Sequence, residues 1–293
     1  PAEQEMRLET FLQEDQRRGF NPGKAPLMRL ALIRTGEHEY RFVWSHHHLL
    51  LDGWSLPLLI QEVMAFYHAS VRGREIELAP ARPYRDYIAW LQRQDLGAAE
   101  GFWRRSLKGF SVPTLLSANG DRDGKRDDKP DYSRRKTRLS SETTAALKAT
   151  ARSHQLTLNA LFQGAWALLL GRYSGEQDVV FGATVSGRPA DLPGAEAMIG
   201  LFINTLPVRV RLRPEAAISS WLQELQVQLA QLRQYEYSPL VSIQGWSDTP
   251  RSMPLFESIL IFENFPIDRS FFDRISDQTL QVGDLRHVSR TNY

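Results

Sequence analysis

The chain has 293 residues, of which 42% are hydrophobic, and a formal net charge of +2 at pH 7. This hydrophobic content is enough for a folded core, and the small charge without a basic run interleaved with aromatics argues against a nucleic-acid partner. The absence of cysteine excludes disulfides, thiolate metal ligands and a cysteine nucleophile. No apolar run is long enough to span a bilayer, so we expect a cytoplasmic protein with no membrane partner.

The first part of the chain is expected to form a helix, a hairpin and a second helix. Hydrophobic periodicity predicts a helix over residues 6–18, a strand over 27–34 and a second strand that starts at Tyr40. Ser55 is predicted as the N-cap of the next helix, because Pro57 suits the first helical turn.

Two aromatic-rich helices are predicted next, before a charged stretch. They cover residues 84–91 and 98–107, and we expect their aromatic side chains to pack into a core. Residues 117–133 are charged, punctuated by glycine and without apolar partners, which is typical of an exposed linker. We therefore expect part of an N-terminal lobe at 1–116 and part of a C-terminal lobe at 134–293.

The second part of the chain alternates predicted strands with predicted helices. The strands are 134–139, 178–185 and 256–262, and the helices are 141–153, one from Thr157 to Gly175, and 218–235. This order predicts an α/β lobe.

Three consecutive histidines stand at the end of the strand that starts at Tyr40. If the alternation of that strand continues, His46 and His48 share the face of Trp44, and His47 points to the opposite face. A carboxylate and a glycine then turn the chain before the predicted helix. The histidines therefore lie between a strand and a helix.

Metal binding is one alternative use of His46 and His48. Zinc would need a third or fourth ligand, and the chain has no His-Glu-x-x-His motif and no cysteine pair. A hydrolase or a nucleotide-binding protein is also disfavoured, because the chain has neither a Gly-x-Ser-x-Gly elbow nor a Walker-type phosphate loop. We therefore expect no metal site.

The spacing His47-His48-x-x-x-Asp52-Gly53 resembles the signature of the condensation domains of nonribosomal peptide synthetases. These domains belong with the chloramphenicol-acetyltransferase-like acyltransferases. His46 does not fit as the first histidine, because its spacing to Asp52 would be one residue too long. Further blocks that resemble the family, in the family's order, are residues 186–189, 199–209 and 262–266. Together they extend the resemblance over essentially the whole chain.

The resemblance implies two chloramphenicol-acetyltransferase-like α/β lobes in a V-shaped pseudo-dimer, with the site in a tunnel between them. Both lobes are expected to be incomplete, because the family's opening block and an arginine-containing block before the hairpin are absent. We therefore expect a fragment that lacks both ends of the family's domain. At residues 235–239 the chain has Tyr-Glu-Tyr-Ser-Pro where the family usually has histidine and glutamine before the proline, so no role is transferred there.

The family joins two building blocks held as thioesters on the phosphopantetheine arms of carrier domains. The resemblance implies peptide-bond formation, with donor and acceptor peptidyl carrier domains and a neighbouring adenylation domain as partners, and no cofactor bound by the chain itself. With Trp54 after Gly53, the motif resembles that of the condensation-domain subgroup that takes L-configured donors. Trp54 is also a candidate for lining the site. The alternative is a non-catalytic module of the same fold that docks carrier domains.

The resemblance gives His48 as the catalytic residue, which contacts the attacking amine as a general base or as a hydrogen-bonding positioner. His47, Asp52 and Gly53 are expected to support the motif. For Asp52 we favour an arginine pair or backbone hydrogen bonds over a triad-like contact with His48. For Gly53 we expect close backbone approach or a positive φ. Asn204 either lines the site or holds its own loop.

Overall fold

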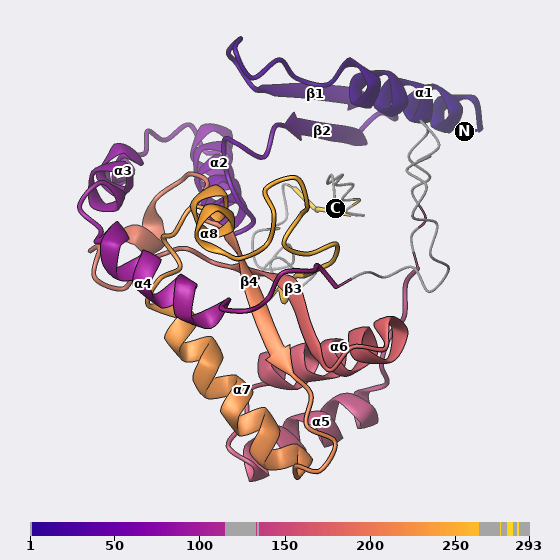
Figure 1. Ribbon diagram of the computed structural model, residues 1–293. Helices are drawn as coiled ribbons and strands as arrows, with labels where there is room; N and C mark the ends of the chain where they lie inside the picture. The colour runs from indigo at the N-terminus through magenta and orange to yellow at the C-terminus, as the bar shows by residue number, and fades with distance from the viewer. Residues whose placement is uncertain are drawn as a thin grey trace. The chain divides into compact units, whose positions relative to one another are not determined.

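A computed structural model describes residues 2–114, 133, 135–263, 276, 280–283 and 286 (Figure 1). The described elements fall into two compact units. Unit 1 takes its elements from residues 2–89 and 188–202, and unit 2 takes them from residues 90–114, 135–187 and 203–263. The predicted linker 117–133 lies outside the described residues except for Ser133, so the predicted lobe boundaries stay a prediction.

Unit 1 contains a two-stranded antiparallel hairpin and several helices. Its elements are α1 (Ala2–Arg18), β1 (Met28–Arg34), β2 (Tyr40–His46), α2 (Ser55–Val71), the start of α3 (Arg85–Leu91) and the 3-10 helix η1 (Ala195–Ala197). The hairpin pairs Leu32 with Phe42 and Leu30 with Trp44. The predicted hairpin is therefore present.

The two faces of this hairpin differ. Arg29 on one face donates to Asp15 of α1 at 2.6 Å, and its guanidinium carbon lies 4.0 Å from the centre of the Phe20 ring. The bond from Arg29 is the main cause of the lowered pKa of Asp15. The opposite face exposes Leu30, Leu32 and Phe42.

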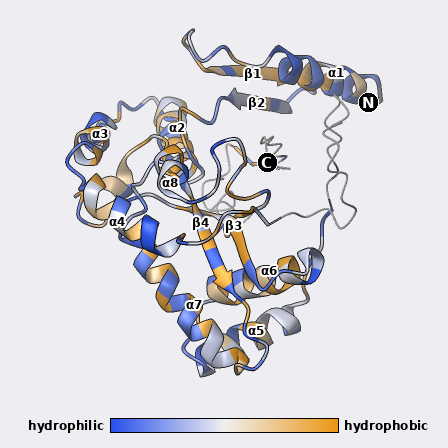
Figure 2. Ribbon diagram, in the orientation of Figure 1, coloured by the Kyte–Doolittle hydropathy of each residue, from blue (hydrophilic) through white to orange (hydrophobic). Residues whose placement is uncertain are grey.

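Unit 2 is an α/β unit with a three-stranded sheet, of which β3 and β4 are labelled in Figure 1. The central strand β3 (Asp178–Val185) is antiparallel to β4 (Asn204–Arg211) and parallel to β5 (Ile259–Leu260). The helices are α4 (Leu96–Ser106), α5 (Ser141–Ser153), α6 (Leu158–Ser174), α7 (Ile218–Arg233) and α8 (Leu240–Trp246). Figure 2 shows that β3 is hydrophobic along most of its length, as expected for a strand covered on both faces.

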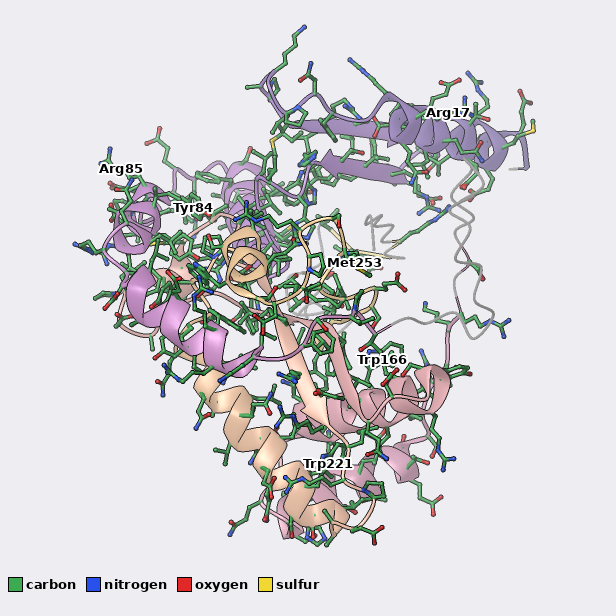
Figure 3. All side chains as sticks on the ribbon, in the orientation of Figure 1. Arg17, Tyr84, Arg85, Trp166, Trp221 and Met253 are labelled. Atoms are coloured by element: carbon green, nitrogen blue, oxygen red, sulfur yellow. The ribbon has the colours of Figure 1, made fainter. Side chains whose placement is uncertain are left out.

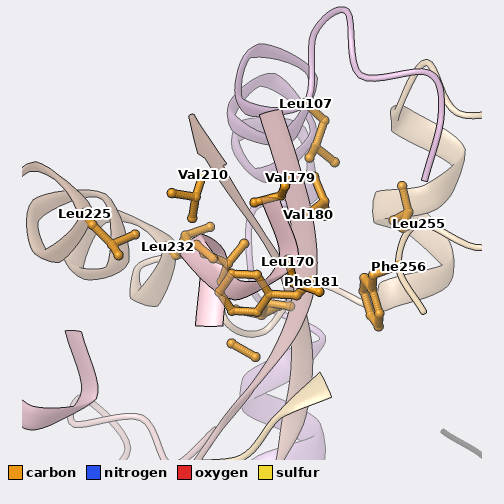
Figure 4. Packing of buried hydrophobic residues seen from close by; sticks show 14 of the residues in the cluster. Leu107, Leu170, Val179, Val180, Phe181, Val210, Leu225, Leu232, Leu255 and Phe256 are labelled. Carbon is orange, nitrogen blue, oxygen red and sulfur yellow. The ribbon is translucent and has the colours of Figure 1, made fainter. Parts of the chain in front are cut away.

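The hydrophobic core of unit 2 forms around β3. Val180 and Phe181 are 1% and 0% exposed, and Leu170 of α6 and Leu225 of α7 belong to the same cluster (Figure 4). Two tryptophans that pack with this core, both labelled in Figure 3, donate hydrogen bonds from their indole nitrogens. Trp166 of α6 donates to Ser258 Oγ at 3.3 Å, and Trp221 of α7 donates to the Arg211 carbonyl at 3.0 Å.

Several helix boundaries of unit 2 follow the sequence signals. The Ser140 hydroxyl accepts from the Thr143 amide at the start of α5, and the Thr157 hydroxyl accepts from the Ala160 amide at the start of α6. Helix α6 ends at Gly175, which has a φ of +74°. The predicted helix 141–153 and the predicted strand 178–185 are confirmed.

Three local predictions are wrong. Residues 135–139 form no strand, because they are exposed and pair with no strand in the described part of the chain. Strand β5 is shorter than the predicted 256–262, because β3 pairs only with Ile259 and Leu260. Ser55 is the first residue of α2, and Trp54 holds the N-cap position without a side-chain cap bond.

The helices are short compared with a bilayer. The longest of those described, α1, α2 and α6, each have 17 residues. No helix in the described ranges is long and apolar enough to cross a membrane.

Candidate active site in the histidine loop

Residues 47–54, which join β2 to α2, form what we call the histidine loop. Strand β2 ends at His46, and the loop begins with a turn in which the His47 carbonyl accepts from the Leu50 amide at 3.1 Å. His48 therefore lies in a turn outside the strand. The prediction that His46 and His48 share one face of the strand is wrong, because β2 ends at His46 and His48 is not part of it.

His47 fixes the start of the histidine loop. Its amide donates to the Leu27 carbonyl at 2.9 Å, and its Nδ1 accepts from the Leu49 amide at 3.1 Å. An accepting Nδ1 carries no proton, so the neutral ring holds its proton on Nε2. The ring also meets Phe20 edge-on, with 6.5 Å between the ring centroids. These contacts fit the prediction that His47 supports the motif. Whether His47 matters for catalysis stays a prediction.

His48 is exposed, and its imidazole makes no hydrogen bond with any described residue. An imidazole in this state can accept or donate a hydrogen bond to a ligand. His48 therefore lies exposed on a turn, and the preceding residue, His47, is held by hydrogen bonds.

Asp52 anchors the other end of the histidine loop and is 1% exposed. Its Oδ1 accepts from the Ser55 amide and hydroxyl, both at 3.0 Å, and from Arg188 Nη2 at 3.1 Å. Its Oδ2 accepts from the Phe202 amide at 3.1 Å. The arginine pair and backbone bonds expected for Asp52 are present, and its carboxylate contacts these donors instead of orienting His48.

Arg188 bonds both to the Asp52 carboxylate and to backbone carbonyls of its own segment, residues 188–202. Its Nη1 donates to the Ala195 carbonyl and, at 2.9 Å, to the Met198 carbonyl. Its guanidinium carbon lies 4.1 Å from the centre of the Phe202 ring, and its side chain is 10% exposed. Arg188 is the arginine partner that Asp52 was expected to have; its identity was not predicted, although it lies in the family-like block 186–189.

Gly200 brings the backbone of the 188–202 segment against the histidine loop. Its carbonyl accepts from the Asp52 amide at 3.1 Å. A Cβ at this position would lie 2.1 Å from the ring of Tyr84, so only glycine allows the ring to pack here. The Tyr84 hydroxyl donates to the Leu201 carbonyl, and its ring meets Phe202 edge-on at 5.2 Å. Burial is the main cause of the raised pKa of Tyr84, and the charge of Asp52 adds to it.

The other residues predicted for the motif have local roles. Gly53 is not among the described glycines with positive φ, so close backbone approach is the remaining expectation for it. Trp54 is half-buried at the start of α2. No group of three or more histidine, aspartate or glutamate side chains placed to hold a metal ion occurs within the described ranges.

Asn204, at the start of β4 in unit 2, holds the loop 235–238 that precedes α8. Its Nδ2 donates to the carbonyls of Glu236 and Ser238, both at 2.8 Å, and its Oδ1 accepts from the Thr205 amide at 2.9 Å. The Ser238 hydroxyl in turn accepts from the Trp103 indole at 3.0 Å. The local bond to the Thr205 amide fits the prediction that Asn204 holds its own loop, and its bonds to residues 236 and 238 were not predicted; a place for Asn204 in the site stays a prediction.

The histidine loop, with Asp52 paired to Arg188, carries the spacing His47-His48-x-x-x-Asp52-Gly53 that resembles the condensation-domain signature. The chain belongs to the condensation-domain family, whose model matches residues 1–292. This match confirms the resemblance found in the sequence.

Two kinds of relatives support this assignment. The chain is 50% identical over 293 residues to one of the proteins that make up linear gramicidin synthase in Brevibacillus parabrevis, and the match covers 100% of this chain but 4% of that protein. The starter condensation domain of rhizomide synthetase has a TM-score of 0.71 at 20% identity, over 89% of this chain and 58% of that chain. The X-domain from teicoplanin biosynthesis, solved in complex with OxyB, has a TM-score of 0.64 at 28% identity, over 79% of this chain and 52% of that chain. The chain thus spans a small part of its curated relatives and just over half of these solved domains.

Proposed function

We propose that this condensation domain joins a donor acyl group to an acceptor amine inside a nonribosomal peptide synthetase. The acceptor nitrogen attacks the donor thioester carbonyl, a C–N bond forms, the C–S bond breaks, and the donor's thiol is released. The family assignment and the 50% identity to a linear gramicidin synthase protein support this reaction. Because a thioester is already activated, the site needs mainly to orient two reactants and manage one proton.

The residue proposed to contact the attacking amine is His48. The observation that carries this proposal is an exposed imidazole on a loop whose two ends are fixed by His47 and Asp52. As a general base, His48 takes the proton of the amine as the C–N bond forms. As a positioner, it accepts a hydrogen bond from the same proton. In both roles His47, Asp52 and Gly53 hold the loop, and neither role needs a metal.

The partners proposed are donor and acceptor carrier domains, each with a phosphopantetheine arm, and an adenylation domain in the parent synthetase. The starter condensation domain of rhizomide synthetase was solved with C8-CoA and Leu-SNAC, which are ligands of that protein. By analogy, we propose thioester-bound substrates for this chain and L-configured donors, because Trp54 follows the motif glycine. We also propose two chloramphenicol-acetyltransferase-like lobes in a V-shaped pseudo-dimer, with Asn204 and Trp54 as candidates near the site.

A second candidate function is a non-catalytic docking module. The X-domain from teicoplanin biosynthesis, which has the same fold, forms a complex with OxyB. This shows that a relative binds a separate protein. The presence of His48 at the motif position and the hydrogen bonds that hold Asp52 favour catalysis over docking for this chain.

The test is amide formation by the parent synthetase module, supplied with carrier proteins loaded with matched donor and acceptor. We expect His48→Ala to lower the rate by about 10²–10⁴-fold if His48 acts as a general base. The matched control is His38→Ala, because His38 is also exposed but lies in the hairpin turn between β1 and β2; this change should leave the rate unaltered. A His48→Ala variant that keeps the wild-type rate would remove His48 from the chemistry, and an inactive, well-folded wild type would favour the docking module.

A further inference from the structure

The hydroxyl of Ser55 is the most densely bonded side-chain atom near the histidine loop. Ser55 is 0% exposed. Its Oγ lies 3.0 Å from Asp52 Oδ1 and 3.0 Å from the Gly200 carbonyl oxygen, which are both acceptors. It lies 3.1 Å from the Gly200 amide and 3.1 Å from Arg188 Nη2, which are both donors. One oxygen therefore contacts three residues of unit 1.

These four contacts use the full capacity of a hydroxyl. Its two lone pairs accept from the Gly200 amide and from Arg188, and its single proton is shared between two acceptors. Because the site is fully buried, water cannot replace these bonds if the hydroxyl is removed. An alanine at this position would leave the Gly200 amide and one arm of Arg188 without this acceptor.

Ser55 also occupies a particular place in the chain. It is the first residue of α2 and follows the histidine loop directly. Its partners Gly200 and Arg188 lie in the 188–202 segment, far away in sequence. Ser55 therefore joins the carboxyl end of the histidine loop to this segment, whereas His47 joins the amino end to the chain before β1.

From this geometry we propose that Ser55 is a positioning residue for condensation, which docks the start of α2 onto Gly200 and so fixes the backbone that carries His48. This inference rests on the proposed function. Ser55 does not touch the reacting atoms in this account, and it acts only through the histidine loop. A loop that is loosened at one end lets His48 occupy many positions, of which few suit the attacking amine.

The experiment measures kcat and KM for amide formation by the parent module with Ser55→Ala. We expect kcat to fall about tenfold to hundredfold, while the KM for the loaded carriers changes less than about twofold. Ser55→Thr keeps the hydroxyl and should recover most of kcat. Should Ser55→Ala fail to fold, Ser55→Cys preserves the size with a weakly accepting sulfur, and it should lower kcat in the same way. The chain has no other cysteine with which this variant could form a disulfide.

The control for a purely structural effect is Ser140→Ala. Ser140 also presents its hydroxyl at the start of a helix, but it caps α5 in unit 2. The proposal fails if Ser55→Ala keeps the wild-type kcat, if Ser140→Ala lowers kcat equally at the same folded fraction, or if Ser55→Thr is no better than Ser55→Ala. The proposed function is tested separately by His48→Ala in the same assay, because an active wild type that depends on His48 leaves it standing whatever Ser55 does.

Discussion

The two units are stabilised in different ways. Unit 2 has an apolar core, in which Val179, Phe181 and Leu206 are at most 1% exposed. Unit 1 buries Asp52 and Ser55 as deeply as its apolar residues Met198 and Phe202, and Arg188 donates a hydrogen bond to each of the two polar side chains. Both units expose some large apolar side chains, for example Leu32 and Phe42 in unit 1 and Tyr173 and Val241 in unit 2.

Apolar burial and a buried ion pair contribute differently: the first mainly stabilises the fold, and the second also fixes the positions of the groups it joins. Apolar burial is nondirectional and tolerates small shifts of a side chain, whereas a buried ion pair with hydrogen bonds demands one arrangement. The histidine loop is held through such directional contacts of Asp52 in unit 1. Unit 1 is therefore suited to hold a loop in place, and unit 2 is suited to supply a stable scaffold.

The largest expected effect concerns the apolar core. Phe181→Ala should lower the free energy of unfolding by about 3–5 kcal/mol, because it removes a fully buried ring and leaves a cavity. Amide hydrogen exchange in β3 and β4 reports this loss locally. If protection in these strands stayed unchanged, the apolar core would not dominate unit 2.

The next effect concerns the buried ion pair. Arg188→Ala should destabilise unit 1 by about 3 kcal/mol, because it leaves the Asp52 carboxylate buried without its cation. The matched control is Arg211→Ala, since Arg211 is 69% exposed and lies 3.6 Å from Asp178; that change should cost only about 0–1 kcal/mol. Hydrogen exchange at the start of α2 measures the loss for Arg188→Ala, and exchange in β4 measures the loss for Arg211→Ala. Equal losses for the two variants would contradict the contrast between the units.

The smallest effect concerns one carboxyl group in unit 2. Burial raises the pKa of Glu236 above its ordinary value of 4.5, although Arg233 partly opposes this. The folded state therefore binds the proton more tightly, and the stability gained from this binding is present below pH 4.5 and is lost as the pH rises through the folded-state pKa. Glu236→Gln should stabilise the protein by about 0.5 kcal/mol at pH 7 and lose this advantage in acid.

Urea unfolding at several pH values measures the difference between Glu236→Gln and the wild type. The exposed Glu215 provides the control variant Glu215→Gln, which should show no such pH dependence. A Glu236→Gln advantage that persists unchanged at low pH would show that charge burial is not its cause.

Local signals explain which parts of the fold were predicted from the sequence. Thr157 and Gly175 mark the ends of α6 because a cap bond and a left-handed residue depend on nearby chain only. Strand β4 was not predicted as a strand, since Pro207 interrupts its sequence and its pairing with β3 comes from a distant segment. Residues 135–139 read as a strand by composition but have no partner among the described strands.

The candidate site shows the same limit. The spacing of His47, His48 and Asp52 identified the histidine loop, because a motif lies within a short stretch. The identity of the arginine that pairs with Asp52 and the bonds of Ser55 were not predicted, because they join residues more than 130 positions apart. Such contacts are set by the path of the whole chain.

The bonds of Asn204 have a consequence for how this family can vary. Asn204 holds the loop 235–238 through the carbonyl oxygens of Glu236 and Ser238, and every amino acid presents the same carbonyl. The loop can therefore exchange its side chains without losing this attachment. Tyr235 and Tyr237 also have side-chain contacts of their own, a stacked ring contact with Phe102 and a hydrogen bond to the Asp95 carbonyl, so exchanging them would remove these contacts while the attachment through Asn204 stays.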